Sequence, residues 1–230
     1  LGIVSLGASY NLKTKHLIVN KNTSVNRFND ITFLSGDINL QDSSINLNAT
    51  MNKLNISFVN QFLQEFIQNL RGDVTGSILV KGKINNPKIS GNLLLKNAAL
   101  KVVMLGTSYS LEDARFTFNN QKIEIEDVIL NDERNGNYTG VLEGNITHNN
   151  FKDFYLNLTL NSDDLLCLNT HEWDSDLFYG YVHAKANMRI KGFLNDLSMD
   201  IDAKPLQGST FYLPLGSTGN ASKFEYVTLK

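Results

Sequence analysis

An alternation of apolar and polar residues with a period of two constrains the fold of this chain more than any other feature. In residues 181–190, every even-numbered residue is Val, Ala, Met or Ile, and every odd-numbered residue is Tyr, His, Lys, Asn or Arg. Successive side chains of a β-strand point to opposite faces. The pattern therefore predicts a half-buried strand, and it recurs in residues 154–162 and 197–203.

Turn-forming dipeptides separate these alternating segments. Asn and Asp side chains tolerate left-handed backbone and form hydrogen bonds to their own turn. Such residues occur at 85–86, 119–120, 149–150 and 195–196, and the whole chain has only three prolines. Strand, tight turn and strand in repetition predict an all-β protein, built as a long antiparallel meander.

One segment departs from the period of two. Val59, Phe62, Leu63, Phe66, Ile67 and Leu70 recur at helical spacing and form one apolar stripe. We expect a short amphipathic helix over about 58–70, with Ser57 as its N-cap and Gly72 as its stop. Its polar face carries mainly Gln, Asn and Glu, which favours a cover for one end of the sheet over a membrane-surface helix.

The apolar face of so many strands needs a cover, and a single helix is too small to supply it. Burying one Leu, Ile, Val or Phe side chain contributes about 1.5–3 kcal/mol, so a flat exposed sheet would lose more than a domain's usual net stability of about 5–15 kcal/mol. The sheet could pack as a sandwich, coil as a β-helix, or fold lengthwise into a trough. Periodicity alone leaves these three options open.

Composition argues against several functional classes. The net charge is -2, and Lys and Arg are scattered singly, so the chain has no basic surface for nucleic acid. Cys167 is the single cysteine, and the four histidines stand in no metal-binding motif. No dinucleotide, P-loop or hydrolase motif is present, so we expect no cofactor and no metal.

Clustered carboxylates leave one enzymatic alternative open. Glu124, Glu126, Asp127 and Asp132 surround the apolar run 128–130, and paired carboxylates can hydrolyse glycosides when they are held at a set separation. Acidic residues at alternating strand positions more often form a wet face. The residues around Trp173 are also acidic, which is typical of a solvated loop. We therefore expect a protein that is not an enzyme.

The order of several blocks along the chain resembles a known family. These blocks combine glycines with alternating apolar residues, and their order and spacing carry the resemblance; they cover residues 72–102, 105–118, 128–154, 178–192, 208–215 and 221–229. The chain is similar to the C-terminal region of the translocation and assembly module B (TamB) family, relatives of AsmA-like envelope proteins, in the form found in Bacteroidota.

The resemblance implies a β-taco, which is a long sheet folded lengthwise around an apolar interior. It further implies a periplasmic protein, anchored in the inner membrane by a segment upstream of this chain. Residues 1–58 would be strands that continue an upstream β-structure, and residues 59–230 would form the TamB C-terminal-like domain. Family members are thought to move phospholipid to the outer membrane, or to help insert outer-membrane proteins together with an Omp85-type (TamA-type) barrel partner.

Two functional hypotheses follow. In the first, the trough shields phospholipid acyl chains and conducts them between the two membranes, and the helix residues Phe62, Leu63, Phe66 and Ile67 cap it. The lipid-facing candidates are Leu142, Ile146, Leu156, Leu158, Leu160, Val182, Ala184, Met188, Ile190, Leu197, Met199 and Ile201. In the second, the edge segment Thr210, Phe211, Tyr212 and Leu213 pairs with the Omp85-type partner by strand addition. A closed core is the plain alternative to an open groove.

Overall fold

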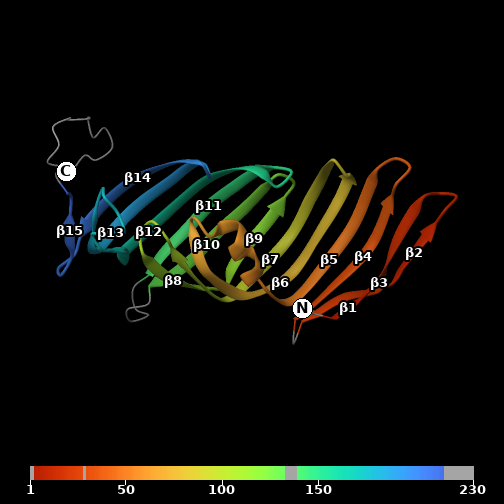
Figure 1. Ribbon diagram of the computed structural model, residues 1–230, viewed down its shortest axis with the longest axis horizontal. Coiled ribbons are helices and arrows are strands. Elements are labelled where there is room, and N and C mark those ends of the chain that lie inside the picture. Colours follow the sequence, from red (N-terminus) through yellow and green to blue (C-terminus); the bar gives the residue numbers. More distant parts are fainter. Residues whose placement is uncertain (1–2, 28–29, 133–138, 215–230) are drawn as a thin grey trace.

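The computed structural model describes residues 3–27, 30–132 and 139–214, which form one antiparallel β-sheet and one short helical segment (Figure 1). The helical segment is a 3-10 turn, η1 (Ser57–Val59), followed by α1 (Asn60–Leu63). The strands are β1 (Ile3–Ser5), β2 (Ala8–Asn11), β3 (His16–Arg27), β4 (Asp30–Asn39), β5 (Ser44–Asn55), β6 (Ile67–Lys83), β7 (Asn86–Val102), β8 (Thr107–Glu112), β9 (Ala114–Asn119), β10 (Lys122–Asp132), β11 (Thr139–Asn149), β12 (Lys152–Thr170), β13 (Tyr179–Phe193), β14 (Asp196–Pro205) and β15 (Thr210–Tyr212).

The strands follow one another across the sheet in chain order. From β3 to β14 each strand pairs with the next, except that β8 and β9 lie end to end between β7 and β10. At the two ends, β1 and β2 both pair with β3, and β15 pairs with β13. The predicted all-β meander is confirmed. Of the blocks that carry the family resemblance, residues 133–138, 215 and 221–229 lie outside the described part of the chain.

A line of backbone kinks crosses the middle strands. Asn69 in β6, Asn97 in β7, Asp113 between β8 and β9, and Asp127 in β10 all have positive φ, from 41° to 54°. The strand register brings Asn97, Asp113 and Asp127 level with one another, because β8 gives way to β9 there and the β10–β11 ladder shifts beside Asp127. Asn69 lies slightly off that line, opposite the stretch of β7 between Ala99 and Lys101. Bulged residues bend a strand and increase its twist. We call this line the crease, and it bends the sheet lengthwise, as a trough requires.

The predicted helix over 58–70 is wrong in its extent. The helical segment ends at Leu63, and Ile67 already belongs to β6, where it pairs with Val102 of β7. The Asn60 side chain fixes the change of direction: its Oδ1 accepts from the Leu70 N–H and its Nδ2 donates to the Leu70 carbonyl, both at 2.8 Å. Short isolated helices are marginal, so strand pairing overrides the helical spacing of 66–70.

The caps expected for that helix are also absent. The 3-10 turn has Ile56 at its N-cap position and no side-chain cap, and Gly72 lies inside β6. The proposed boundary between residues 58 and 59 falls within one continuous sheet, since β5 and β6 pair along most of their length. The division into two domains stays a prediction.

Candidate functional site

One row of apolar residues runs across the sheet on a single face. Each member lies directly opposite the next in the strand register, and the row takes one residue from every strand between β4 and β14 except β8. Every member is half-buried. We call it the apolar row: Leu34, Ala49, Ile78, Gly91, Phe118, Ile123, Ile146, Leu156, Gly192 and Leu197.

The opposite face carries an equally regular row of polar residues. It is shifted by one position along each strand, so that Asn157 follows Leu156 in β12. The polar row is Thr50, Ser77, Asn92, Thr117, Glu124, Asn145, Asn157, Lys191 and Ser198. The sheet is therefore amphipathic from β5 to β14, with one apolar face and one polar face.

Burial on the apolar face increases toward the crease. Leu95, Ala114 and Val128, which adjoin the crease, are all buried in one hydrophobic cluster with Tyr109 and Leu165. The apolar row lies further along the strands, and its members remain partly accessible. We call the buried residues beside the crease the floor of the trough, and the partly accessible residues further along the strands its wall.

The predicted lipid-facing residues all lie on this apolar face, at different depths. They lie at alternate positions of β11 to β14, either in the apolar row or between two and ten residues from its member in the same strand. Five are buried: Leu158, Leu160, Val182, Ala184 and Met188. Four in the middle strands are half-buried, namely Leu142, Ile146, Leu156 and Ile190. On β14, Leu197 is half-buried, whereas Met199 and Ile201 are 37% and 49% exposed.

The predicted capping residues do not form a cap as a group. Phe62 is 72% exposed, Leu63 and Phe66 are half-buried, and Ile67 is part of β6. The helical segment packs against β6. An exposed Phe62 contributes little cover to the apolar face.

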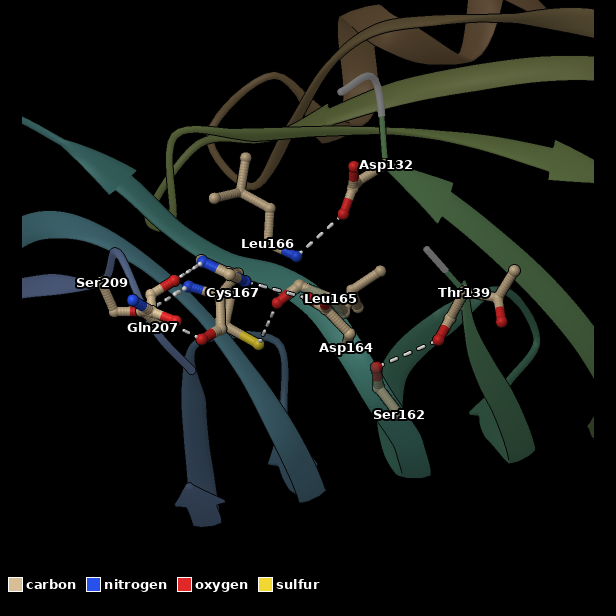
Figure 2. Close-up of polar contacts among 10 residues, drawn as sticks. Asp132, Thr139, Ser162, Asp164, Leu165, Leu166, Cys167, Gln207 and Ser209 are labelled. Carbon is tan, nitrogen blue, oxygen red and sulfur yellow. Dashed lines mark hydrogen bonds and ion pairs between the residues drawn. The ribbon is translucent and has the colours of Figure 1, made fainter. Parts of the chain in front are cut away.

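Three hydrogen bonds join β12 to β8, to β10 and to the turn before β8, and Figure 2 draws the one from Asp132. The Asp132 carboxylate, 1% exposed, accepts a hydrogen bond of 3.0 Å from the Leu166 N–H. The Tyr109 hydroxyl donates to the Leu166 carbonyl at 2.8 Å, and the Asn169 N–H donates to the Leu105 carbonyl at 2.8 Å. Together these three hydrogen bonds pair backbone groups in the part of β12 that extends beyond the start of β11. The sequence patterns identified neither Tyr109 nor this role of Asp132.

A second set of polar contacts positions β15. His183 of β13 lies between the Asp164 carboxylate, 3.1 Å from Nδ1, and the Gln207 carbonyl, 2.9 Å from Nε2. The Ser209 hydroxyl donates to the His183 carbonyl at 2.9 Å; Asp164, Gln207 and Ser209 are drawn in Figure 2. These contacts attach the loop before β15 to β13.

The predicted partner strand is ordered and paired on one side. Thr210, Phe211 and Tyr212 form β15, whose partners in β13 are Tyr181, Gly180 and Tyr179, and Leu213 follows half-buried. In the described part of the chain no strand pairs with the other edge of β15 or with the outer edge of β14. Pairing with a partner protein at these edges stays a prediction.

The carboxylates around 128–130 do not converge on an open cleft. Glu124 belongs to the polar row and contacts Lys122 at 2.9 Å, Asp127 lies at the crease, and Asp132 is buried. Among the described residues no three His, Cys, Asp or Glu side chains are grouped so that they could hold a metal ion. The hydrolase alternative has no structural support in this arrangement.

Burial lowers the pKa of His148 from its ordinary value. This side chain, 5% exposed, stacks on Phe151 with ring centroids 4.7 Å apart, and its Nδ1 accepts from the Phe151 N–H at 3.2 Å. An acceptor at Nδ1 requires the neutral ring. His148 is therefore neutral in the folded protein, whereas it takes up a proton more readily when the chain is unfolded.

We expect folding stability to decrease as the pH falls below about 6.5, the ordinary pKa of histidine. In that range His148 binds a proton in the unfolded chain but not in the folded chain. The free energy of unfolding should therefore fall by at most about 1.4 kcal/mol per pH unit. Urea unfolding of the wild type and of His148→Gln between pH 7.5 and 5.5 measures this dependence of stability on pH. The variant should lose less stability, and exposed His171→Gln serves as the control. Parallel curves for wild type and His148→Gln would contradict the assignment.

Comparison with known proteins identifies the family. In the described residues no helix is long and apolar enough to span a membrane. The model of the TamB C-terminal domain family matches residues 29–136 and 127–228, which together make up 200 of the 230 residues. Neither the curated proteins nor the solved structures include a significant match. The chain therefore belongs to the TamB C-terminal domain family and has that family's role in envelope and outer-membrane assembly.

Proposed function

We propose that this chain is part of an envelope scaffold that shields phospholipid acyl chains and conducts them between the inner and outer membranes. The apolar row carries the proposal, because it extends without a polar interruption from β4 to β14 and none of its members is buried. An acyl chain lying along this face would cross strand after strand in contact with apolar side chains.

The energetics of such a surface suit transport. Each buried methylene contributes about 0.8 kcal/mol, and apolar contact is not directional. A chain of many methylenes would therefore be held firmly and still slide from one strand to the next. The polar row on the other face keeps the scaffold compatible with an aqueous compartment, which we propose is the periplasm, with an anchor in the inner membrane upstream of this chain.

The proposed role requires no catalytic group and no cofactor. Conduction changes no covalent bond, so binding and release along the face are sufficient. We accordingly propose that the chain is not an enzyme, in agreement with the dispersed carboxylates of β10.

A charge placed in the apolar row is expected to remove bound lipid. Leu156 is half-buried, so the carboxylate of Leu156→Glu can stay hydrated without unfolding the sheet, while it makes burial of an acyl chain costly. We expect at least about a tenfold loss of co-purifying phospholipid, which corresponds to about 1.4 kcal/mol. Native mass spectrometry with lipid extraction measures the amount bound.

The adjacent residue supplies the control. Asn157 is exposed and belongs to the polar row. Asn157→Glu therefore introduces the same charge on the polar face and should leave the lipid content unchanged. Leu158 and Met188 are poor test positions, since both are buried in the hydrophobic cluster and a charge there would unfold the protein. Equal lipid content in the two Glu variants, or a wild type without lipid, would refute the conduit.

A second candidate function is supported by the open sheet edges. The outer edge of β14 and the second edge of β15 have no strand partner in the described residues, and exposed edges are templates for strand addition. An Omp85-type outer-membrane barrel is the proposed partner. A wild type that carries no lipid in the experiment above would favour this binding role over the conduit.

A further inference from the structure

Exposed aromatic and apolar side chains gather at the β13–β15 end of the sheet. In the loop 171–178, Trp173 is 81% exposed and Leu177 is 64% exposed. In β15, Phe211 and Tyr212 are 48% and 52% exposed. Phe178 of the loop stacks on Phe211, and Tyr179 at the start of β13 stacks on Tyr212, with ring centroids 6.1 and 4.9 Å apart. The loop therefore packs against β15, and Phe211 lies on the same face of the sheet as Val182, whereas Tyr212 lies on the opposite face. We call the loop 171–178 and β15 together the aromatic tip.

Hydrogen bonds within the loop hold the aromatic tip in shape. The Asp174 carboxylate accepts from the His171 N–H at 2.7 Å, and the Asp174 N–H donates to the His171 carbonyl at 2.9 Å. The Ser175 hydroxyl accepts from the Leu177 N–H at 3.2 Å. Trp173 stacks on the His171 ring at 4.6 Å with an interplanar angle of 3°. A side chain presented on an ordered loop loses little entropy on binding.

The aromatic tip is continuous with the apolar face of the trough. Phe178 packs against the cluster formed by Leu168, Val182, Ala184 and Ala186. These β13 residues share a face with Met188 and Ile190, which adjoin the apolar row. Apolar side chains therefore lead from the trough to Phe178, which is next in the chain to the exposed Leu177.

The charges of the loop determine which kind of lipid surface the aromatic tip can bind. The loop contains Glu172, Asp174 and Asp176 and no Lys or Arg, so an anionic lipid surface would repel it. Ammonium headgroups would be attracted by the carboxylates and by the face of the Trp173 ring. Trp and Tyr side chains also prefer the boundary between headgroups and acyl chains.

We propose that the aromatic tip docks on a bilayer of zwitterionic, ammonium-bearing phospholipid, with Leu177 and Trp173 entering the interface. The proposal rests on the conduit function and adds to it the place where the trough meets a membrane. Continuity with Phe178 would let an acyl chain pass between bilayer and trough without crossing water.

Trp173 is the single tryptophan of the chain, so the tryptophan fluorescence of the protein reports on the surroundings of this residue alone. Vesicles of phosphatidylethanolamine and phosphatidylcholine should shift its fluorescence emission to shorter wavelength, and vesicles of phosphatidylglycerol should shift it much less. Leu177→Glu should weaken partitioning into the zwitterionic vesicles by about tenfold or more, the effect of one buried leucine. Leu12→Glu is the control, because Leu12 is 81% exposed near β2, at the other end of the sheet.

Uptake of a fluorescent fatty-acid analogue by the same proteins separates this proposal from the conduit. Uptake without an emission shift would overturn docking by the tip and leave the conduit intact, whereas a shift without uptake would support the tip and count against the conduit. Equal partitioning of Leu177→Glu and Leu12→Glu would also overturn the proposal. So would an emission shift that appears only with a barrel protein and never with lipid.

Discussion

Leu165→Ala is expected to lower the free energy of unfolding by about 2–5 kcal/mol. Leu165 is completely buried in the hydrophobic cluster at the crease, beside a register shift in β12. Gly140 packs closely against it, since a Cβ at Gly140 would lie 3.1 Å from Leu165 Cδ2. Backbone on one side and strand pairing on the other limit collapse of the cavity, so the cost should lie in the upper part of this range.

Chemical denaturation followed by circular dichroism measures the change. Leu177→Ala removes the same atoms from a side chain that is 64% exposed and should change stability by less than about 0.5 kcal/mol. A loss below about 1 kcal/mol for Leu165→Ala would mean that the crease is not packed as a core. The floor of the trough would then be as accessible as its wall.

Gly144→Ala is expected to disrupt the pairing of β11 with β12. Gly144 has a φ of +133°, a region that L-residues rarely adopt, and a Cβ there would lie 2.2 Å from the Asn157 carbonyl oxygen. The backbone conformation alone costs about 1–3 kcal/mol. The contact with backbone oxygen adds to this cost, because the neighbouring strand must move away.

Gly82→Ala separates these two contributions. Gly82 also has a positive φ, +112°, but the nearest atom to an added Cβ is 3.5 Å away, which is ordinary contact. Gly82→Ala should therefore show the conformational cost alone, and Gly144→Ala should be clearly less stable in the same denaturation experiment. Equal losses would show that β11 and β12 can separate at no cost.

Much of the architecture was predictable because alternation is a local property. The residues of β12, β13 and β14 that share the apolar face were correctly grouped from their spacing, and the predicted turns at 119–120 and 149–150 begin at the last residues of β9 and β11. The order of weak blocks also identified the family, which the matches over 29–228 confirm. Neither inference required knowledge of long-range contacts.

The segment 66–70 shows where local reasoning fails. Its helical spacing is real, yet Phe66 is the last residue of the turn before β6, and Ile67 pairs with Val102, far along the chain. A β-ladder satisfies backbone groups that a marginal helix would also satisfy, and the ladder adds packing against β7. The choice depends on a partner that local periodicity does not reveal.

Depth within the trough likewise needed the tertiary structure. Leu156 and Leu158 are equivalent in pattern, but Leu158 is buried and Leu156 is half-buried. The difference is their distance from the crease, whose members Asn97, Asp113 and Asp127 have no common spacing along the chain. Only the register of neighbouring strands brings those kinks into one line.

By itself, the sequence determined that this protein is an antiparallel meander with one apolar face, because side-chain alternation and turn chemistry act within a few residues. The tertiary structure alone decided where the sheet bends, which apolar residues form its filled floor, and which aromatic side chains stay outside at the tip. These features depend on contacts between residues far apart in the chain, such as Tyr109 with Leu166 and Phe178 with Phe211. Their energies arise only once register and curvature have brought the partners together.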